Sequence, residues 1–247
     1  MAITMAGFGS RFAKAGYTVP KYQIEVFGRP LFDWSMLALT AFRDAGWRFA
    51  FAVRADDRAR DFITERCKIL GIDIAHFADL PAPTDGQATT ARILAAAAED
   101  RQQPFAIFNI DTFVRPGAMT PDEVPADCDG WVPCFPGPGE GWSFVRLGDD
   151  GKAVELREKQ RISPHATVGF YWFGSVALYI DAYDRFFAHG GEEKGERYVA
   201  PLYNQLIADG RTVRISNLSL DDVGQLGTPD QVTLFEKSPP AGAKVYI

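Results

Sequence analysis

Two glycines, an arginine and a lysine near the start of the sequence have the types and spacing to bind phosphate. Gly7 and Gly9 carry no side chains, so a phosphate oxygen can approach the main-chain N–H groups around them. Arg11 can donate two parallel hydrogen bonds to phosphate oxygens, and Lys21 adds a second positive charge. The segment from residue 5 to residue 21 is therefore predicted to hold the phosphates of a nucleoside triphosphate.

Other glycine-rich nucleotide motifs do not fit this segment. A dinucleotide-binding loop needs a third glycine at position 12, where this sequence has Phe12. A Walker loop needs Gly-Lys-Ser or Gly-Lys-Thr, which the segment lacks. The motif therefore indicates a triphosphate loop of another kind.

Strands and helices alternate in the first part of the chain. Apolar runs predict strands over 2–6, 49–53, 72–77 and 105–110, the last followed by Asp111. Helical spacing predicts helices over 30–46, 56–70 and 87–100, the third with a cap within 84–86. Because these strands are apolar on both faces, we expect a parallel sheet covered by helices on both sides.

The pattern changes after residue 120. Runs at 131–135, 142–147, 153–159 and 167–173 predict strands of a mixed or antiparallel sheet. Helices are expected over 176–188, 196–208 and 229–237, and a strand over 212–215. We expect an α/β fold with a mixed, mainly parallel central sheet flanked by helices. It would form one domain, 1–247, with a nucleotide-binding half (1–120) and an acceptor-binding half (121–247).

The first motif resembles the signature of a known family. Residues 5–21, extended by Gly28-Arg29-Pro30, resemble the signature of the sugar-phosphate nucleotidyltransferases, which have a Rossmann-like core related to type A glycosyltransferases. Arg29 stands where the family more often has lysine. The resemblance implies that Lys21 contacts the α-phosphate and that the triphosphate is surrounded by Ala6, Gly7, Gly9, Ser10 and Arg11.

Shorter motifs extend the resemblance to about residue 235, in the family's order. Gly86-Gln87-Ala88-Thr89-Thr90 resembles the segment that contacts the nucleobase, with Gly86 and Gln87 reading its edge. Asn109-Ile110-Asp111 resembles the N-x-D whose aspartate holds Mg²⁺. The remaining matches are Glu158-Lys159 and Thr167-Val168-Gly169, which imply the acceptor site, and the late triplet Gly227-Thr228-Pro229.

The sequence departs from the family at the second metal ligand. The family usually has an aspartate two residues before the late triplet, and this chain has Gln225 there. Asp221 and Asp222 lie slightly upstream. The resemblance implies Mg²⁺ as cofactor on Asp111, with Asp222 as the candidate second ligand and a solvated loop charge as its alternative role.

The implied reaction joins a phosphorylated acceptor to the α-phosphorus of the triphosphate and releases pyrophosphate. Two anions must meet in line, so positioning and charge neutralisation are the main requirements. Arg11 would stabilise the departing pyrophosphate, Lys21 the α-phosphate, and Lys159 the acceptor phosphate. No general base is needed, because a phosphate nucleophile is already ionised at neutral pH.

Two substrate features follow from the residues. The side-chain amide of Gln87 can both donate and accept hydrogen bonds, which suits a pyrimidine base. The compact second half allows a sugar phosphate or another small phosphorylated acceptor, such as phosphocholine. Nearby, spacing favours core packing for Tyr198 and Tyr203, and it leaves Glu196, Arg197 and Asn204 as candidate pocket residues.

Two other functions remain open at this stage. A glycosyltransferase on the same core would use a nucleotide-sugar and usually a D-x-D motif, but Phe113 stands where its second aspartate would be. A non-catalytic nucleotide sensor could have kept the loop and lost the second metal ligand, as Gln225 allows.

The overall composition of the chain indicates which classes of partner it can bind. The 247 residues are 47% hydrophobic, with a net charge of -6, whereas nucleic-acid-binding proteins usually carry positive charge. Three cysteines and no CxxC pair indicate free thiols in a reducing compartment. No apolar run approaches the roughly 20 residues that span a membrane. We expect a cytoplasmic protein that binds neither nucleic acid nor membrane; its oligomeric state is not predicted.

Overall fold

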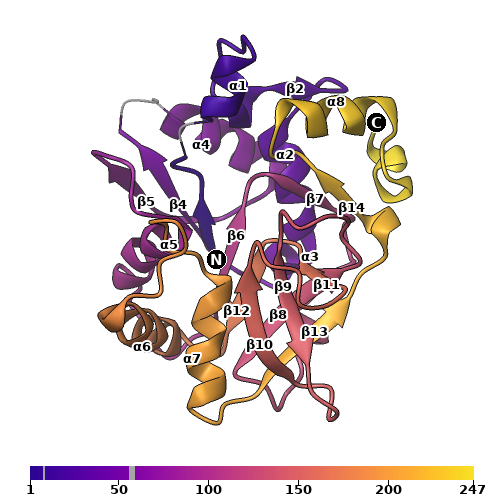
Figure 1. Cartoon of the computed structure of the whole chain (residues 1–247). Coiled ribbons are helices and arrows are strands. Elements are labelled where there is room, and N and C mark those ends of the chain that lie inside the picture. Colours follow the sequence, from indigo (N-terminus) through magenta and orange to yellow (C-terminus); the bar gives the residue numbers. More distant parts are fainter. Residues whose placement is uncertain (8, 56–58) are drawn as a thin grey trace. The chain divides into compact units, whose positions relative to one another are not determined.

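The computed structural model describes residues 1–7, 9–55 and 59–247, which divide into two compact units (Figure 1). Unit 1 comprises Met1–Ala2, Thr84–Phe108 and Asp122–Leu218. Unit 2 comprises Ile3–Pro83, Asn109–Pro121 and Ser219–Ile247. Each unit is therefore built from three separate stretches of the chain.

Unit 2 contains a parallel strand pair packed with helices. Its strands are β1 (Ala2–Thr4, from Ile3 onward), β2 (Glu25–Val26), β3 (Arg29–Pro30), β4 (Phe49–Arg54), β5 (Ile74–Leu80), β7 (Thr112–Val114) and β14 (Val223–Gln225). Its helices are α1 (Ser10–Lys14), α2 (Leu31–Met36), α3 (Thr40–Asp44), α4 (Ala59–Leu70) and α8 (Pro229–Lys237), with 3-10 turns at Lys21–Gln23, Leu37–Leu39, Leu220–Asp222 and Ala241–Tyr246. β4 pairs with β5 in parallel, and β14 pairs with β7 antiparallel.

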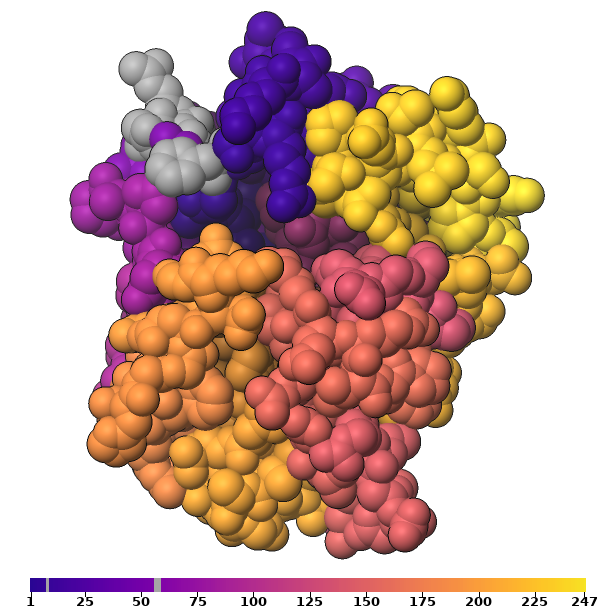
Figure 2. All heavy atoms as spheres, viewed as in Figure 1, coloured from indigo at the N-terminus to yellow at the C-terminus, as the bar shows by residue number. Residues whose placement is uncertain are grey.

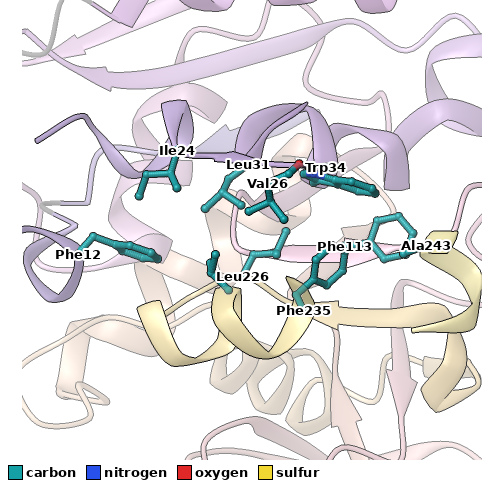
Figure 3. Close-up of a cluster of buried hydrophobic side chains, with 10 residues drawn as sticks. Phe12, Ile24, Val26, Leu31, Trp34, Phe113, Leu226, Phe235 and Ala243 are labelled. Atoms are coloured by element: carbon teal, nitrogen blue, oxygen red, sulfur yellow. Dashed lines mark hydrogen bonds between the residues drawn. The ribbon is translucent and has the colours of Figure 1, made fainter. Parts of the chain in front are cut away.

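One hydrophobic cluster joins the first and last segments of unit 2. Phe12 of α1, Trp34 of α2, Phe113 of β7 and Phe235 of α8 are all buried in it, as Figure 3 shows. The ring of Trp34 lies edge-on to both Phe113 and Phe235, with centroids 5.6 and 5.2 Å apart. Figure 2 shows the N-terminal segment (indigo) beside the C-terminal segment (yellow) at the surface. The cluster therefore fixes α1, which follows the glycine loop, against α8.

Unit 1 is built mainly on antiparallel strands. Its strands are β6 (Phe105–Asn109, to Phe108), β8 (Gly130–Phe135), β9 (Ser143–Leu147), β10 (Ala153–Glu158), β11 (His165–Thr167), β12 (Phe170–Phe173) and β13 (Val213–Asn217). Its helices are α5 (Gln87–Ala96), α6 (Val176–Phe186) and α7 (Tyr203–Ala208), with 3-10 turns at Phe187–His189 and Ala200–Leu202. The antiparallel pairs are β10 with β9, β11 with β8 and β9, and β12 with β6 and β8, whereas β13 runs parallel to β8.

The core of unit 1 is aromatic. Tyr203 stacks on Phe173 with ring centroids 4.5 Å apart, and its hydroxyl donates to the Trp172 carbonyl. A Cβ at Gly130 would lie 2.5 Å from the Tyr203 ring, so only glycine fits opposite it. This packing holds α7 against β8 and β12.

The predicted α/β class is confirmed: among the described residues, each unit combines strands with helices, and both parallel and antiparallel strand pairs occur. Several predicted bounds were wrong. The strand expected over 167–173 is two strands, because Gly169 adopts φ 81° between β11 and β12. The helix expected over 196–208 is α-helical only from Tyr203. The strands β7 and β14 and the helix α1 were not predicted.

Other predictions hold or lie partly outside the described residues. Positions 56–58 of the helix expected over 56–70 are outside them, as is Phe8 of the glycine loop. The described remainder, α4, is helical as predicted. All three cysteines are free, as expected. Across the described residues, no helix is both long and apolar enough to cross a membrane.

Candidate functional site

A cavity of about 360 Å³ in unit 2 brings together most of the predicted triphosphate-binding residues. Its lining includes Gly7, Gly9, Ser10, Arg11, Lys21, Asn109 and Asp111. These residues come from three places in the sequence, namely the first loop, the turn that begins at Lys21, and the end of β6 with the residues directly after it. Ala6 lies within the first loop but does not line the cavity.

The glycine loop is fixed at both ends. At its start, the Met5 N–H donates to the Ala52 carbonyl of β4 over 3.3 Å. At its end, Gly9 adopts the left-handed conformation (φ 58°) that precedes α1. Phe12, one residue after Arg11, is buried in the hydrophobic cluster. This anchor leaves the Arg11 side chain exposed at the rim of the cavity.

Lys21 is held inside the cavity by an ion pair. Its Nζ lies 3.4 Å from the Asp111 carboxylate, and its side chain is only 16% exposed. Burial lowers the pKa of Lys21 below its ordinary 10.5, Asp111 opposes that shift, and the charge of Arg11 adds to it. Two like charges so close to each other indicate a site that binds an anion.

The residues of unit 2 that directly follow β14 lie beside Asp111. The Leu226 N–H donates to the Asp111 carbonyl over 2.8 Å. A Cβ at Gly227 would lie in ordinary contact with Asp111 Oδ2, at 3.4 Å, but only 3.0 Å from Gln231 Oε1, so a larger residue there would require the Gln231 amide to shift. Nearby, Oδ1 of Asn109 is buried and has no hydrogen-bond partner among the described residues. Such an unpaired acceptor is costly unless a ligand or water satisfies it.

The predicted second metal ligand is engaged elsewhere in unit 2. The Asp222 carboxylate accepts from the Arg115 guanidinium and from the Ser219 N–H at the start of a 3-10 turn. The Gln225 amide oxygen accepts from Gln231. Among the described residues, no three His, Cys, Asp or Glu side chains cluster as a metal site would require. The assignment of Asp222 therefore stays a prediction without geometric support.

Arg29 has a structural role in unit 2. Its guanidinium lies 5.1 Å from the centroid of the Trp34 ring and donates to the Tyr246 carbonyl. These contacts tie the β2–β3 hairpin to the C-terminal turn. They explain how an arginine can stand where the family more often has lysine.

The predicted nucleobase segment belongs to unit 1. Gly86 precedes α5 with φ 143°, and a Cβ there would lie 2.4 Å from the Arg197 carbonyl oxygen. The Thr89 hydroxyl is hydrogen-bonded to Asp85 and to Tyr183. A side chain at position 86 would collide with the Arg197 backbone, so packing alone requires glycine there. The base contacts of Gly86, Gln87 and Thr89 stay predictions.

Unit 1 also contains a larger cavity, of about 730 Å³, at the end of β10. The predicted acceptor residues Glu158 and Lys159 line it, as do Glu193 and Asn204. Both amide atoms of Asn204 bond the Leu156 backbone, so this side chain fixes the cavity wall. Asn204, one of the predicted pocket residues, therefore lines the cavity, and both of its amide atoms are used to hold the backbone of the wall.

Glu158 lies at one end of a buried chain of hydrogen-bonded hydroxyl groups. Its carboxylate accepts from Ser143, whose oxygen lies 3.3 Å from the Tyr171 hydroxyl, which in turn lies 3.1 Å from Thr167. The side chain of Glu158 is 9% exposed. Burial raises the pKa of Glu158, as do Glu193 and Glu196, whereas Ser143 and Lys159 oppose this. The chain connects two predicted acceptor residues, Glu158 and Thr167.

Lys159 has two contacts that sequence reasoning missed. Its Nζ donates to the Tyr198 hydroxyl over 2.5 Å and lies 4.4 Å from the centroid of that ring. The Tyr198 hydroxyl donates to Glu196. The predicted core role is confirmed for Tyr203, which is fully buried, but it was wrong for Tyr198. Helical spacing misled the prediction, because residues 196–199 are not helical.

Comparison with known proteins supplies independent information. No protein-family model matches the chain, and no curated protein matches it. A solved structure described as the nucleoside-diphosphate-sugar pyrophosphorylase from Vibrio cholerae RC9 is 36% identical, with a TM-score of 0.88 over 96% of this chain and 100% of its own. The inositol-1-phosphate CTP transferase from T. maritima shares the fold at 14% identity, with a TM-score of 0.75 over 93% of this chain and 89% of its own.

Proposed function

The chain belongs to the sugar-phosphate nucleotidyltransferase family, and we propose that it joins a nucleoside triphosphate to a small phosphorylated acceptor with release of pyrophosphate. The observation that carries the proposal is the cavity of unit 2, where Gly7, Gly9, Arg11, Lys21 and Asp111 meet. Identity of 36% with a pyrophosphorylase over its whole length supports the same activity.

The cations of unit 2 have distinct tasks in this proposal. Lys21 is buried and would neutralise charge at the α-phosphate, where two anions must meet. Arg11 is exposed at the rim and would bind the pyrophosphate as it leaves. The Asn109 amide oxygen lacks a partner and would accept from the nucleotide or from an ordered water. These tasks require positioning and charge, not proton transfer.

We propose that unit 1 binds the acceptor. Lys159 would hold the acceptor phosphate, and Glu158 would accept hydrogen bonds from its hydroxyl groups. A cavity of about 730 Å³ has room for a sugar phosphate. Sugar phosphates are the favoured acceptor class, and a pyrimidine triphosphate is the favoured donor because Gln87 carries an amide.

We also propose Mg²⁺ as the cofactor, entering with the triphosphate. Among the described residues that line the cavity, Asp111 is the one carboxylate, and its side chain is 39% exposed. Asn109 adds an amide oxygen. Oxygen donors and a single carboxylate suit Mg²⁺, which usually keeps waters and substrate phosphates as its other ligands. When bound, the ion would neutralise charge on the phosphate oxygens.

Substitutions in the cavity of unit 2 test the proposal. Arg11→Ala and Asp111→Asn should each lower the rate of pyrophosphate release by roughly 100-fold or more, as is typical when a group that neutralises transition-state charge is lost. Lys14→Ala is a matched control, because Lys14 is an exposed cation on the same helix that does not line the cavity. The rate would be measured with a coupled pyrophosphate assay on folded protein.

The relative activities of the three variants decide whether the proposal holds. The proposal requires full activity in Lys14→Ala and strong loss in the other two. Full activity in Arg11→Ala or Asp111→Asn would show that this cavity is not the site of transfer.

A further inference from the structure

The ammonium group of Lys159 is held on one side by a tyrosine and a glutamate. Lys159 donates to the Tyr198 hydroxyl, which donates onward to Glu196. Glu158 lies 3.7 Å away on another side. An ammonium group has three N–H donors, so at least one is left for a ligand.

The backbone of Lys159 is constrained as well. Lys159 has φ 50°, a left-handed conformation that long side chains rarely adopt. Its N–H donates to the Trp142 carbonyl over 2.9 Å, which fixes the turn directly after β10. Backbone strain of this kind is found where the position of a side chain matters for function.

Tyr198 and Glu196 are themselves placed by a hairpin turn over residues 190–197. The backbones of Glu193 and Glu196 exchange hydrogen bonds of 2.9 and 3.1 Å. Arg197 anchors the end of the hairpin to Asp85 and Glu192, at 3.2 and 3.0 Å. The turn therefore presents Glu196 and Tyr198 to Lys159 from a fixed base.

We propose that Tyr198 and Glu196 are positioning residues that hold the Lys159 ammonium in place for the acceptor phosphate. The inference rests on the proposed function, in which Lys159 binds that phosphate. A free lysine side chain loses rotamer entropy when it is fixed, so fixing it in advance strengthens binding of the acceptor.

Charge and protonation agree with this role. Burial raises the pKa of Tyr198, and its hydrogen bond to Glu196 raises it further, so the hydroxyl remains a donor to Glu196 at neutral pH. With its proton directed at Glu196, the tyrosine oxygen presents a lone pair to Lys159. Replacing the hydroxyl removes this acceptor and leaves the ring.

Tyr198→Phe is the direct test. The acceptor KM should rise roughly tenfold, with the triphosphate KM unchanged, because a hydrogen bond to a charged group is lost on the acceptor side alone. Glu196→Gln should act in the same direction but more weakly. Tyr203→Phe is the matched control: it removes a buried hydroxyl of the same unit that bonds the Trp172 carbonyl, and it should leave the acceptor KM unchanged.

A double-mutant cycle separates positioning from simple damage. In the Lys159→Ala background, Tyr198→Phe should have no further effect on the acceptor KM. Additive effects, an unchanged acceptor KM in Tyr198→Phe, or an equal rise in both KM values would each overturn the proposal.

A second measurement does not depend on activity. Side-chain NMR of lysine ¹⁵Nζ and ¹³Cε groups should show a lower order parameter for Lys159 in Tyr198→Phe than in the unsubstituted protein. Equal order in both proteins would overturn the positioning role. If order falls as expected but no acceptor supports pyrophosphate release, the proposed function fails and the positioning contact stands.

Discussion

Lys21 and Asp111 illustrate how charge is arranged in the cavity of unit 2. Their ion pair, at 3.4 Å, offsets part of the free energy that burial of the ammonium costs. Arg11 is close enough to lower the pKa of Lys21 further. In the proposed function, this excess of positive charge is the feature that favours a triphosphate.

Glu158 provides a pH-dependent prediction. Its folded pKa is raised above the ordinary 4.5, chiefly by burial, so its ionised form destabilises the fold. Glu158 therefore destabilises the protein progressively as pH rises from about 4.5 through the raised folded pKa. Glu158→Gln removes the charge, so its free energy of unfolding should increase relative to that of the unsubstituted protein across this window.

Urea denaturation at a series of pH values measures this difference. A matched variant is Glu155→Gln: Arg146 and Arg157 lower the pKa of Glu155, so its ionised form stabilises the fold, and the variant should have a lower free energy of unfolding above about pH 4.5, by an amount that shrinks only as pH falls below that value. A difference between Glu158→Gln and the unsubstituted protein that stays constant across the window would contradict the account.

At the residue scale, the sequence predicted the cavity of unit 2 better than that of unit 1. Gly9, Arg11, Lys21 and Asp111 were named from motif order, and the structure brings them together. Tyr198 was predicted to pack in the core instead, because its contact with Lys159 depends on a glycine-rich turn whose path no local pattern indicates.

At the scale of elements, the β7–β14 pair and the hydrophobic cluster explain how distant segments meet at Asp111. β14 pairs with β7 in a register that sets Gln225 opposite Thr112, the residue after Asp111. Strands of three residues are too short to show alternation in a sequence, so this pair could not be predicted. The late triplet Gly227-Thr228-Pro229 could be assigned only through the family resemblance.

Phe235 tests the contribution of the cluster. This side chain is 2% exposed and contacts Trp34 and Phe113, so Phe235→Ala should lower the free energy of unfolding by about 3–5 kcal/mol. Leu234→Ala, on the same helix but 63% exposed, should lower it by less than about 0.5 kcal/mol. Chemical denaturation gives both values. Similar losses in the two variants would contradict the role assigned to the cluster.

Gln225 tests the metal proposal at the β14 position. Gln225→Asp supplies a second carboxylate near Asp111, so the nucleotide-free protein should bind Mn²⁺, used as a probe for Mg²⁺, at least tenfold more tightly. Electron paramagnetic resonance of free Mn²⁺ gives the affinity. Asp222→Asn is the control and should change nothing, because Asp222 is engaged by Arg115. Loss of Mn²⁺ binding in Asp222→Asn would instead restore Asp222 as a ligand.

At the scale of the whole molecule, the two compact units do not follow the order of the sequence. Thr84–Phe108 belongs to unit 1, although the prediction placed it in the nucleotide-binding half. Hydrophobic periodicity gives elements but no long-range contacts, so such interleaving could not be predicted. The division into functional halves at residue 120, like the cytoplasmic location, stays a prediction.

The α/β class was predictable because strands such as β4 and β6 are nearly continuous apolar runs. β4, with the run Phe49–Val53, is fully buried there, as a strand of a covered parallel sheet should be. The mixture of parallel and antiparallel pairs in unit 1 was expected only in general terms. Its register depends on side-chain packing between strands, such as that of Trp172 opposite Trp131.

The central claim is tested most directly by product analysis with unsubstituted protein. The protein would be incubated with Mg²⁺, each of the common nucleoside triphosphates and a panel of sugar phosphates, and ³¹P NMR would follow the products. We predict pyrophosphate and a nucleoside-diphosphate sugar in equal amounts with at least one pair. Nucleotide binding without pyrophosphate for every acceptor would contradict the claim and indicate a sensor. In a parallel incubation with nucleotide-sugars in place of the triphosphates, release of a nucleoside diphosphate would contradict the claim in favour of a glycosyltransferase.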